Sequence, residues 1–308
     1  MKVTIPILKS SILIFASSLG LLMTGFAQAK GILPLTGLKY FNEGLSAKSL
    51  NVKIDGAQIL SNRIPLNKEI EISLQQANGF VADNKKTVFA GAEIIVLSPK
   101  GEVLSSEANV LAKNQATGFT AKDLNNFNIK FMVSAALMKT NLNAFVKIRL
   151  YDMKGKSQMR LEMPVTFARY GERLQVSKMV TAIKTSDAAN GMICGLHAKN
   201  MQVRVDTSIK VAPKMAYTSM DISRIEGSSL AGMFDGKESF WVYDSDLNEV
   251  KISDILLKQV KGALENDAVD YTLKIPYRLK AKTAKLYTVR YRWESPDKTQ
   301  VIDIVVVI

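Results

Sequence analysis

Two stretches of this sequence, 146–165 and 289–308, share one pattern and align without a gap. The first reads VKIRLYDMKGKSQMRLEMPV and the second reads VRYRWESPDKTQVIDIVVVI. In both, apolar and basic residues alternate, a turn-rich segment follows (MKGKS or SPDKT), and a second apolar alternation comes after it. Alternation with a period of two is typical of a β-strand with one buried and one solvated face. The two stretches therefore predict two β-hairpins, one in each copy of a duplicated unit.

Three further pairs of segments extend the match between the two halves of the chain. They are 50–55 with 201–206, 92–103 with 238–250, and 128–133 with 271–276. The first and third pairs predict strands, and the middle pair is apolar on both faces, as a central strand covered on both sides would be.

Many short strands separated by turn signals are typical of a β-sandwich. We therefore predict an all-β chain with two tandem, internally duplicated immunoglobulin-like β-sandwich domains after a cleaved signal peptide. A single closed barrel is the alternative, but the internal match favours two equivalent units. The predicted divisions are a signal peptide (1–29), a lead-in segment (30–48), the first repeat (49–167), an inter-domain segment (168–199) and the second repeat (200–308).

The signal peptide is predicted from the beginning of the chain. Lys2 and Lys9 precede an apolar run at 11–23, and Ala27-Gln28-Ala29 follows as a cleavage site of small residues. A retained membrane anchor is the alternative, but the run is shorter than the about 20 residues that span a bilayer. The signal peptide predicts export, and no later stretch is apolar enough to span a membrane. We therefore expect an exported protein that is either periplasmic or extracellular at the cell surface.

Three regions outside the matched segments carry further structural predictions. The alternating segment RLQVSKMVTAI at 173–183 predicts an extra strand at the end of the first domain or the start of the second. In the second copy, 251–267 contains SDILLKQVKGAL, whose apolar spacing predicts a short amphipathic helix. The corresponding region of the first copy, 105–126, also looks partly helical.

The net charge is strongly positive, +13 for the whole chain. A basic exported protein suggests anionic neighbours such as an acidic polysaccharide, a phosphorylated envelope lipid or an acidic protein. The basic residues are spread along the sequence without forming a run, so a diffuse excess that aids solubility is the favoured interpretation. We do not expect a nucleic-acid partner.

Few residues suggest chemistry. Cys194 is the only cysteine and His197 the only histidine, so an internal disulfide and a zinc site built on cysteine or histidine are excluded by count. The two residues lie in an extended-looking segment, where their spacing places them on opposite faces and disfavours a catalytic pair. A Gly-x-Ser-x-Gly motif, a phosphate-binding glycine loop and a dinucleotide fingerprint are all lacking. We therefore expect no enzyme activity, cofactor or metal.

Four residues are candidates for binding. Asp244 and Asp246 lie in the turn YDSDLNE, which suits calcium or, as we favour, a solvated hairpin turn. Tyr277 and Tyr287 are candidates for a contact surface.

The other aromatic residues of the second copy are predicted to belong to its core. Tyr291 and Trp293 align with Ile148 and Leu150, and Phe240 and Trp241 likewise align with isoleucines, so these positions are apolar in both copies. The arginines between them, Arg290 and Arg292, are expected on the opposite, solvated face.

The sequence thus predicts an exported, non-enzymatic interaction or structural protein of the cell envelope or exterior, which binds a protein partner through sandwich loops or edge strands. The alternative is a carbohydrate-binding module or accessory protein for an anionic polysaccharide, suggested by the charge and the aromatic residues. A hydrolase with paired carboxylates is the third possibility.

Overall fold

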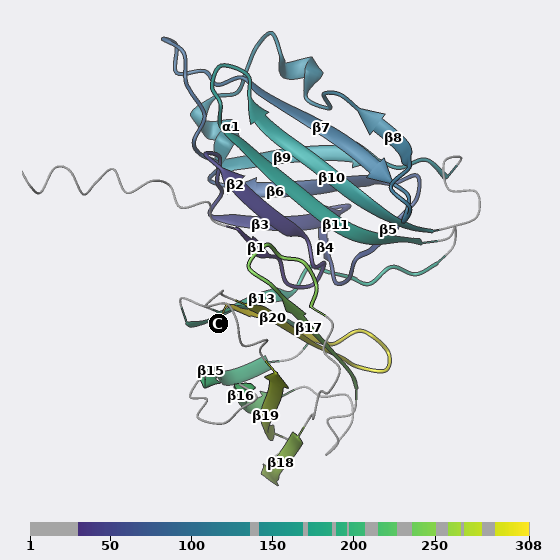
Figure 1. Cartoon of the computed structure of the whole chain (residues 1–308), viewed down its shortest axis with the longest axis vertical. Coiled ribbons are helices and arrows are strands. Elements are labelled where there is room, and N and C mark those ends of the chain that lie inside the picture. Colours follow the sequence, from purple (N-terminus) through teal and green to yellow (C-terminus); the bar gives the residue numbers. More distant parts are fainter. Residues whose placement is uncertain are drawn as a thin grey trace, which may run out of the picture.

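The computed structural model describes residues 30–135, 142–168, 172–186, 189–195, 197–206, 215–226, 236–250, 258–265, 268–278 and 287–307. Within these ranges, only the backbone is described for residues 183–186, 189, 197–206, 215–226, 258–265 and 268–278. The fold is all-β, and nearly all strand pairs are antiparallel (Figure 1). No helix among the described residues is long and apolar enough to cross a membrane.

The first unit contains two sheets. The larger has seven strands in the order β1-β2-β11-β10-β7-β8, with β5 also paired to β11, and the smaller has five in the order β12-β4-β3-β6-β9. The strands are β1 (Lys30–Ile32), β2 (Lys39–Glu43), β3 (Ser49–Ile54), β4 (Ala57–Ile59), β5 (Arg63–Pro65), β6 (Glu69–Gln75), β7 (Ala90–Leu97), β8 (Val103–Glu107), β9 (Asn126–Met132), β10 (Asn143–Asp152), β11 (Gln158–Ala168) and β12 (Val176–Ser177).

Side chains from both sheets of the first unit share one core. Inward residues of β3, β6 and β9 pack with inward residues of β7, β10 and β11 in a single buried cluster. The alternation of β10 matches this arrangement, because Val146, Ile148 and Leu150 are buried while Lys147 and Arg149 are exposed. The first hairpin therefore has the one buried and one solvated face that its sequence predicts.

Two short helices interrupt the strands of the first unit. The 3₁₀ helix η1 (Ala112–Asn114) and the α-helix α1 (Ala121–Asn125) lie between β8 and β9, as the partly helical pattern there predicts. Thr120 begins α1 with a capping box: its side chain accepts from the Asp123 N–H and the Asp123 side chain accepts from the Thr120 N–H. The Asp123 pKa is lowered chiefly by this backbone hydrogen bond.

The second unit has a five-stranded sheet, in the order β13-β14-β21-β20-β17, and a four-stranded sheet, in the order β15-β16-β19-β18. The strands are β13 (Val180–Ser186), β14 (Ala189–Cys194), β15 (His197–Asp206), β16 (Met215–Glu226), β17 (Lys237–Tyr243), β18 (Lys258–Glu265), β19 (Ala268–Arg278), β20 (Thr288–Glu294) and β21 (Val301–Val307).

Both predicted hairpins are present and share a register. In the first hairpin Val146 pairs with Met163, and in the second Val289 pairs with Val306, the residues that align in sequence. The alternating segment at 173–183 contributes to both units, because β12 pairs with β4 of the first unit and β13 pairs with β14 of the second.

The second hairpin differs from its prediction in one respect. Its outer face is buried as well as its inner face, since all residues of β20 from Thr288 to Trp293 are buried. The expected solvated face of Arg290 and Arg292 is therefore wrong. Strand alternation reports only which residues share a face, and here the face that carries the charges packs against the first unit.

The helix predicted within 251–267 is also wrong for its described part. Residues Lys258–Glu265 form β18, which pairs with β19 through a register shift. The helical preference of this short segment is weak, and the hydrogen bonds offered by β19 outweigh it.

The core of the first unit gives a direct test of the alternation. Ile148→Ala should lower the free energy of unfolding by about 2–5 kcal/mol, because it leaves a cavity between β7 and β11. Arg149→Ala, one residue along, removes an exposed ion pair with Glu93 and a contact with the Tyr151 ring, and should cost less than about 1 kcal/mol. Calorimetric unfolding of both variants measures the difference; equal losses would show that β10 does not bury one face.

Candidate functional site

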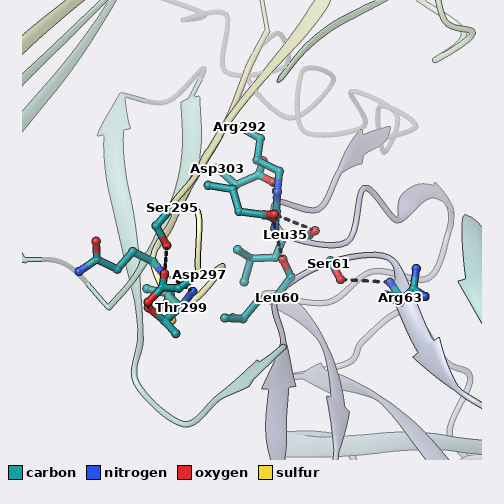
Figure 2. A network of polar contacts seen from close by, with 12 residues as sticks. Leu35, Leu60, Ser61, Arg63, Arg292, Ser295, Asp297, Thr299 and Asp303 are labelled. Atoms are coloured by element: carbon teal, nitrogen blue, oxygen red, sulfur yellow. Dashed lines mark hydrogen bonds and ion pairs between the residues drawn. The ribbon is translucent and has the colours of Figure 1, made fainter. Parts of the chain in front are cut away.

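The most unusual polar site lies where the two units meet. The first unit contributes the turn between β1 and β2 and the residue after β4, and the second contributes β20 and β21 (Figure 2). The β1–β2 turn is closed by two backbone hydrogen bonds, from Leu33 N–H to the Leu38 carbonyl at 2.7 Å and from Gly37 N–H to the Leu33 carbonyl at 3.0 Å. Leu35, at its tip, has a positive φ of 72°. Such a backbone conformation is strained for a leucine and is retained only where its surroundings hold it.

Asp303 on β21 is the centre of this junction. It is completely buried, and its carboxylate accepts hydrogen bonds from two arginines of the neighbouring strand β20. Arg290 donates from Nε at 3.0 Å and from Nη2 at 2.7 Å, one bond to each carboxylate oxygen. Arg292 donates from Nη1 at 3.1 Å. The planar guanidinium of Arg290 thus binds the carboxylate in the bidentate geometry that gives the strongest ion pairs.

The same arginines bind main-chain oxygens of the first unit. The Leu35 carbonyl accepts from Nη2 of Arg290 and from Nη1 of Arg292, each at 3.2 Å. The Leu60 carbonyl accepts from Nη2 of Arg292 at 2.6 Å, and Glu294 accepts from the same nitrogen at 2.7 Å. We call the set of Asp303, Arg290, Arg292 and these acceptors the arginine junction; it ties the second unit to two loops of the first.

Burial and the charge of Asp303 act in opposite directions on the Arg290 pKa. Burial by itself lowers the pKa of Arg290, but the charge and hydrogen bonds of Asp303 outweigh it and the pKa is raised. Arg290 therefore stays charged and lies 4.7 Å from the ring centroid of Trp241. Burial likewise raises the pKa of Tyr243, which lies beside Arg290.

Sequence reasoning missed the arginine junction, although a signal for it exists. Asp303 is the one acidic residue in an otherwise apolar strand, VIDIVVV, and its cross-strand partner is Arg292. The aligned residue of the first hairpin is Arg160, which is exposed and bound to Glu43. The second hairpin alone has an acidic residue opposite an arginine at this position. Such a difference between the two hairpins indicates a contact that the first hairpin does not make.

A cleft of about 510 Å³ opens beside the arginine junction. One wall is the outer face of β10 and β11, with Phe145, Lys147 and Glu162, and the other is the outer face of β17, with Lys237 and Trp241. Clefts of this size between domains are common binding sites.

Lys39 lines the same cleft and connects its walls. Its Nζ donates to the Leu247 carbonyl and lies 5.0 Å from the ring centroid of Tyr243. Burial lowers the Lys39 pKa, while the negative charges of Glu162 and Glu249 oppose the change.

The predicted acidic turn forms as expected, but its carboxylates have protein partners. Asp244 accepts at Oδ1 from the N–H groups of Asp246 (2.8 Å) and Asn248 (3.0 Å), which is the local pattern of an Asx turn. Asp246 accepts from Lys30 Nζ at 3.3 Å and so contacts the first unit. No group of three histidine, cysteine, aspartate or glutamate residues suited to a metal occurs among the described residues.

The two predicted tyrosines do not come together in a described site. Tyr287 is half-buried just before β20 and does not line the cleft. Tyr277 is on β19 opposite Ala216, and its side chain lies outside the described residues. The His197 side chain is also outside them, whereas Cys194 is buried with its Sγ 3.9 Å from the Thr299 carbonyl.

The aromatic residues of the second hairpin belong to the core, as predicted: Tyr291 and Trp293 are each 2% exposed. Trp241 and Phe240 are only partly buried. For Trp241 the reason is its position on the outer face of β17, where it forms part of the cleft wall.

A second concave surface lies at the far side of the first unit. It is a groove of about 380 Å³ between β8, η1 and β9, lined by Ile94, Val96, Val110, Phe131 and Val133 among others. We call it the β8–β9 groove.

No protein-family model matches this chain, and no curated protein matches it significantly.

Removal of the central charge should destabilise the arginine junction. Asp303→Asn leaves two buried guanidinium groups without their common counter-ion and should lower the free energy of unfolding by about 3–5 kcal/mol. Asp246→Asn breaks an exposed ion pair that also joins the two units, with Lys30, and should cost less than about 1 kcal/mol. Both tryptophans are in the second unit, so urea unfolding followed by their fluorescence measures the two variants alike; similar losses would contradict the assigned role of Asp303.

The β1–β2 turn offers a second test, with a matched glycine as its control. Gly37 and Gly56 have similar positive φ angles, 70° and 73°, so alanine strains the backbone at both. A Cβ on Gly37 would lie 2.4 Å from Nη1 of Arg290, whereas one on Gly56 has nothing within 4 Å. Gly37→Ala should therefore lower the melting temperature more than Gly56→Ala and alter the fluorescence of Trp241. Equal shifts would mean that Arg290 does not depend on this turn.

Proposed function

We propose that this chain is an exported, non-enzymatic interaction protein of the cell envelope or exterior, in which two immunoglobulin-like sandwiches present a joint surface to a protein partner. The observation that carries the proposal is the arginine junction. Domains connected in one chain move relative to each other unless a substantial interface holds them. Here a buried ion-pair network, bound to main-chain oxygens of the other unit, holds the cleft walls in place.

The strand order supports the immunoglobulin-like part of the proposal. In the first unit β3-β6-β9 face β11-β10-β7, and in the second β15-β16-β19-β18 accompany β21-β20-β17. With β15 to β21 taken as strands A to G, this is the ABED and GFC arrangement of an immunoglobulin constant-type sandwich. The common hairpin register supports an origin of the two units by duplication.

The charges of the cleft suit a polypeptide partner. Lys147 and Glu162 lie 3.7 Å apart on one wall, and Lys237 and Glu249 line the other side. The cleft therefore presents both positive and negative side chains, which can pair with opposite charges on a partner. Such charge complementarity gives specificity and faster association. The partly buried Trp241 and the 43% exposed Phe145 supply the aromatic surface that interfaces favour.

A carbohydrate ligand is the second candidate, favoured by the same two aromatic residues together with Lys39, Lys147 and Lys237 along the cleft. An acidic saccharide would stack on the rings and pair its carboxylates with the lysines. Binding of the purified protein to an array of acidic glycans, lost in Phe145→Ala, would select this candidate.

The proposal is tested by photo-crosslinking in the host cell. A photoreactive amino acid at Lys147, inside the cleft, should capture the same envelope protein in repeated experiments, and one at the exposed Lys122 on α1 should not. Asp303→Asn should reduce the capture several-fold, because it loosens the cleft walls. The recovered protein should begin at Lys30, as expected after export. Capture of no protein from Lys147, or equal capture from both positions, would contradict the proposal.

A further inference from the structure

The strand β9 is an edge of the smaller sheet. It pairs with β6, and no other described strand pairs with it. Its residues alternate between the core and the exterior: Phe127, Ile129 and Phe131 are buried, whereas Lys130 and Met132 are exposed. Met132 is 61% exposed, a large value for such an apolar side chain.

The register shows which main-chain groups of β9 face outward. A hydrogen bond from the Gln76 N–H to the Asn125 carbonyl, at 3.1 Å, continues the β6–β9 pairing beyond its last paired residues. Hydrogen-bonded pairs alternate along antiparallel strands, so Phe127, Ile129 and Phe131 bond to β6. The N–H and carbonyl groups of Asn128, Lys130 and Met132 consequently point away from β6.

The N–H and carbonyl groups of β9 that point away from β6 have almost no hydrogen-bond partner among the described residues. Only the Asn126 N–H, at the beginning of β9, is bound, to the Asp123 carbonyl at the end of α1. Unpaired groups in a row along an edge are a template for another strand.

The β8–β9 groove lies directly beside this edge. Its floor combines inward side chains of the opposite sheet, Ile94 and Val96 on β7, with Phe131 on β9. A strand added next to β9 would place alternate side chains over these residues and extend the core of the sandwich.

The second unit shows what occupies the equivalent position. There β19, the strand that precedes the hairpin as β9 does, pairs with β16 on one side and with β18 on the other. In the first unit the chain between β8 and β9 does not pair with β9 but bonds to the other sheet, for example through Val110 N–H to the Ala92 carbonyl at 2.9 Å. Among the described residues of the first unit, no strand therefore takes the place on β9 that β18 takes on β19.

We propose that the β9 edge and the β8–β9 groove bind an extended segment of a partner protein, which adds to β9 as an antiparallel strand in the position that β18 takes on β19. The segment should have apolar residues at alternate positions, for the groove, and an acidic residue beside Lys130. This is strand addition, in which main-chain hydrogen bonds supply affinity and side-chain pockets supply specificity. The surface is separate from the cleft at the arginine junction and does not depend on it.

Lys130 also argues against a second copy of this chain as the occupant. A lysine on an edge strand opposes pairing between identical edges, since it brings like charges together across the new ladder. An acidic segment is attracted by the same side chain, which binds Glu69 of β6 at 2.8 Å in the unbound edge.

The probe is a displayed library of random nine-residue peptides, selected on the purified protein. Selected peptides should alternate apolar and polar residues and include an acidic position. Lys130→Pro removes an outward N–H without loss of a β6 hydrogen bond and should weaken their binding at least tenfold. Lys130→Thr keeps the N–H and suits a strand, so it should weaken binding less than threefold. Ser105→Trp, which fills the groove from β8 and leaves β9 unchanged, should also abolish binding.

Three outcomes would overturn this proposal. The first is a library with no peptide above background, and the second is a set of peptides that bind Lys130→Pro and Ser105→Trp as well as the unmodified protein. The third is concentration-dependent dimerisation that Lys130→Pro abolishes, which would identify a second copy as the occupant. Circular dichroism and thermal unfolding of each variant verify its fold. Crosslinking from Lys147 is unaffected by these substitutions, so failure here is distinguishable from failure of the proposed function.

Discussion

The relation between the two units depends on one buried carboxylate. Asp303 is the shared counter-ion of two charged and nearly enclosed arginines, the second of which also pairs with Glu294. Isolated ions in such an environment are strongly unfavourable. With the carboxylate present, the guanidinium groups have donors left over for the Leu35 and Leu60 carbonyls. A buried ion pair adds little net stability compared with apolar packing, but it demands one geometry. Its contribution here is specificity of arrangement, because the same guanidinium groups must meet the Asp303 carboxylate and the Leu35 and Leu60 carbonyls at once.

Much of the fold follows from alternation in the sequence, and the limits of that pattern are equally clear. Alternation predicts the two hairpins and which residues share a face, as Val146, Ile148 and Leu150 show. It does not tell which face meets solvent, since that depends on elements distant in the chain. The arginines of β20 were therefore expected in water. The short segment that forms β18 was expected to be a helix because its apolar spacing suits one, and that spacing does not show the pairing with β19.

The candidate surfaces were less predictable than the strands. A cleft between two units and a groove beside an edge are both made by residues from several elements, so no local motif announces them. Sequence comparison within the chain does carry part of this information. The aspartate in VIDIVVV has an arginine as its counterpart in the first hairpin, and at this unequal position the contacts of the two hairpins differ.

The β1–β2 turn makes contacts that form late in folding. Its Leu35 carbonyl binds arginines that lie 255 and 257 residues later in the chain. Contacts between segments so far apart form late, because a long loop must first be closed. The β1–β2 turn is therefore held in place only after β20 and β21 have been synthesised and have folded. A chain truncated before β20 could still pair β1 with β2 but would lack this restraint, so the arginine junction distinguishes chains that contain both units from chains that lack β20.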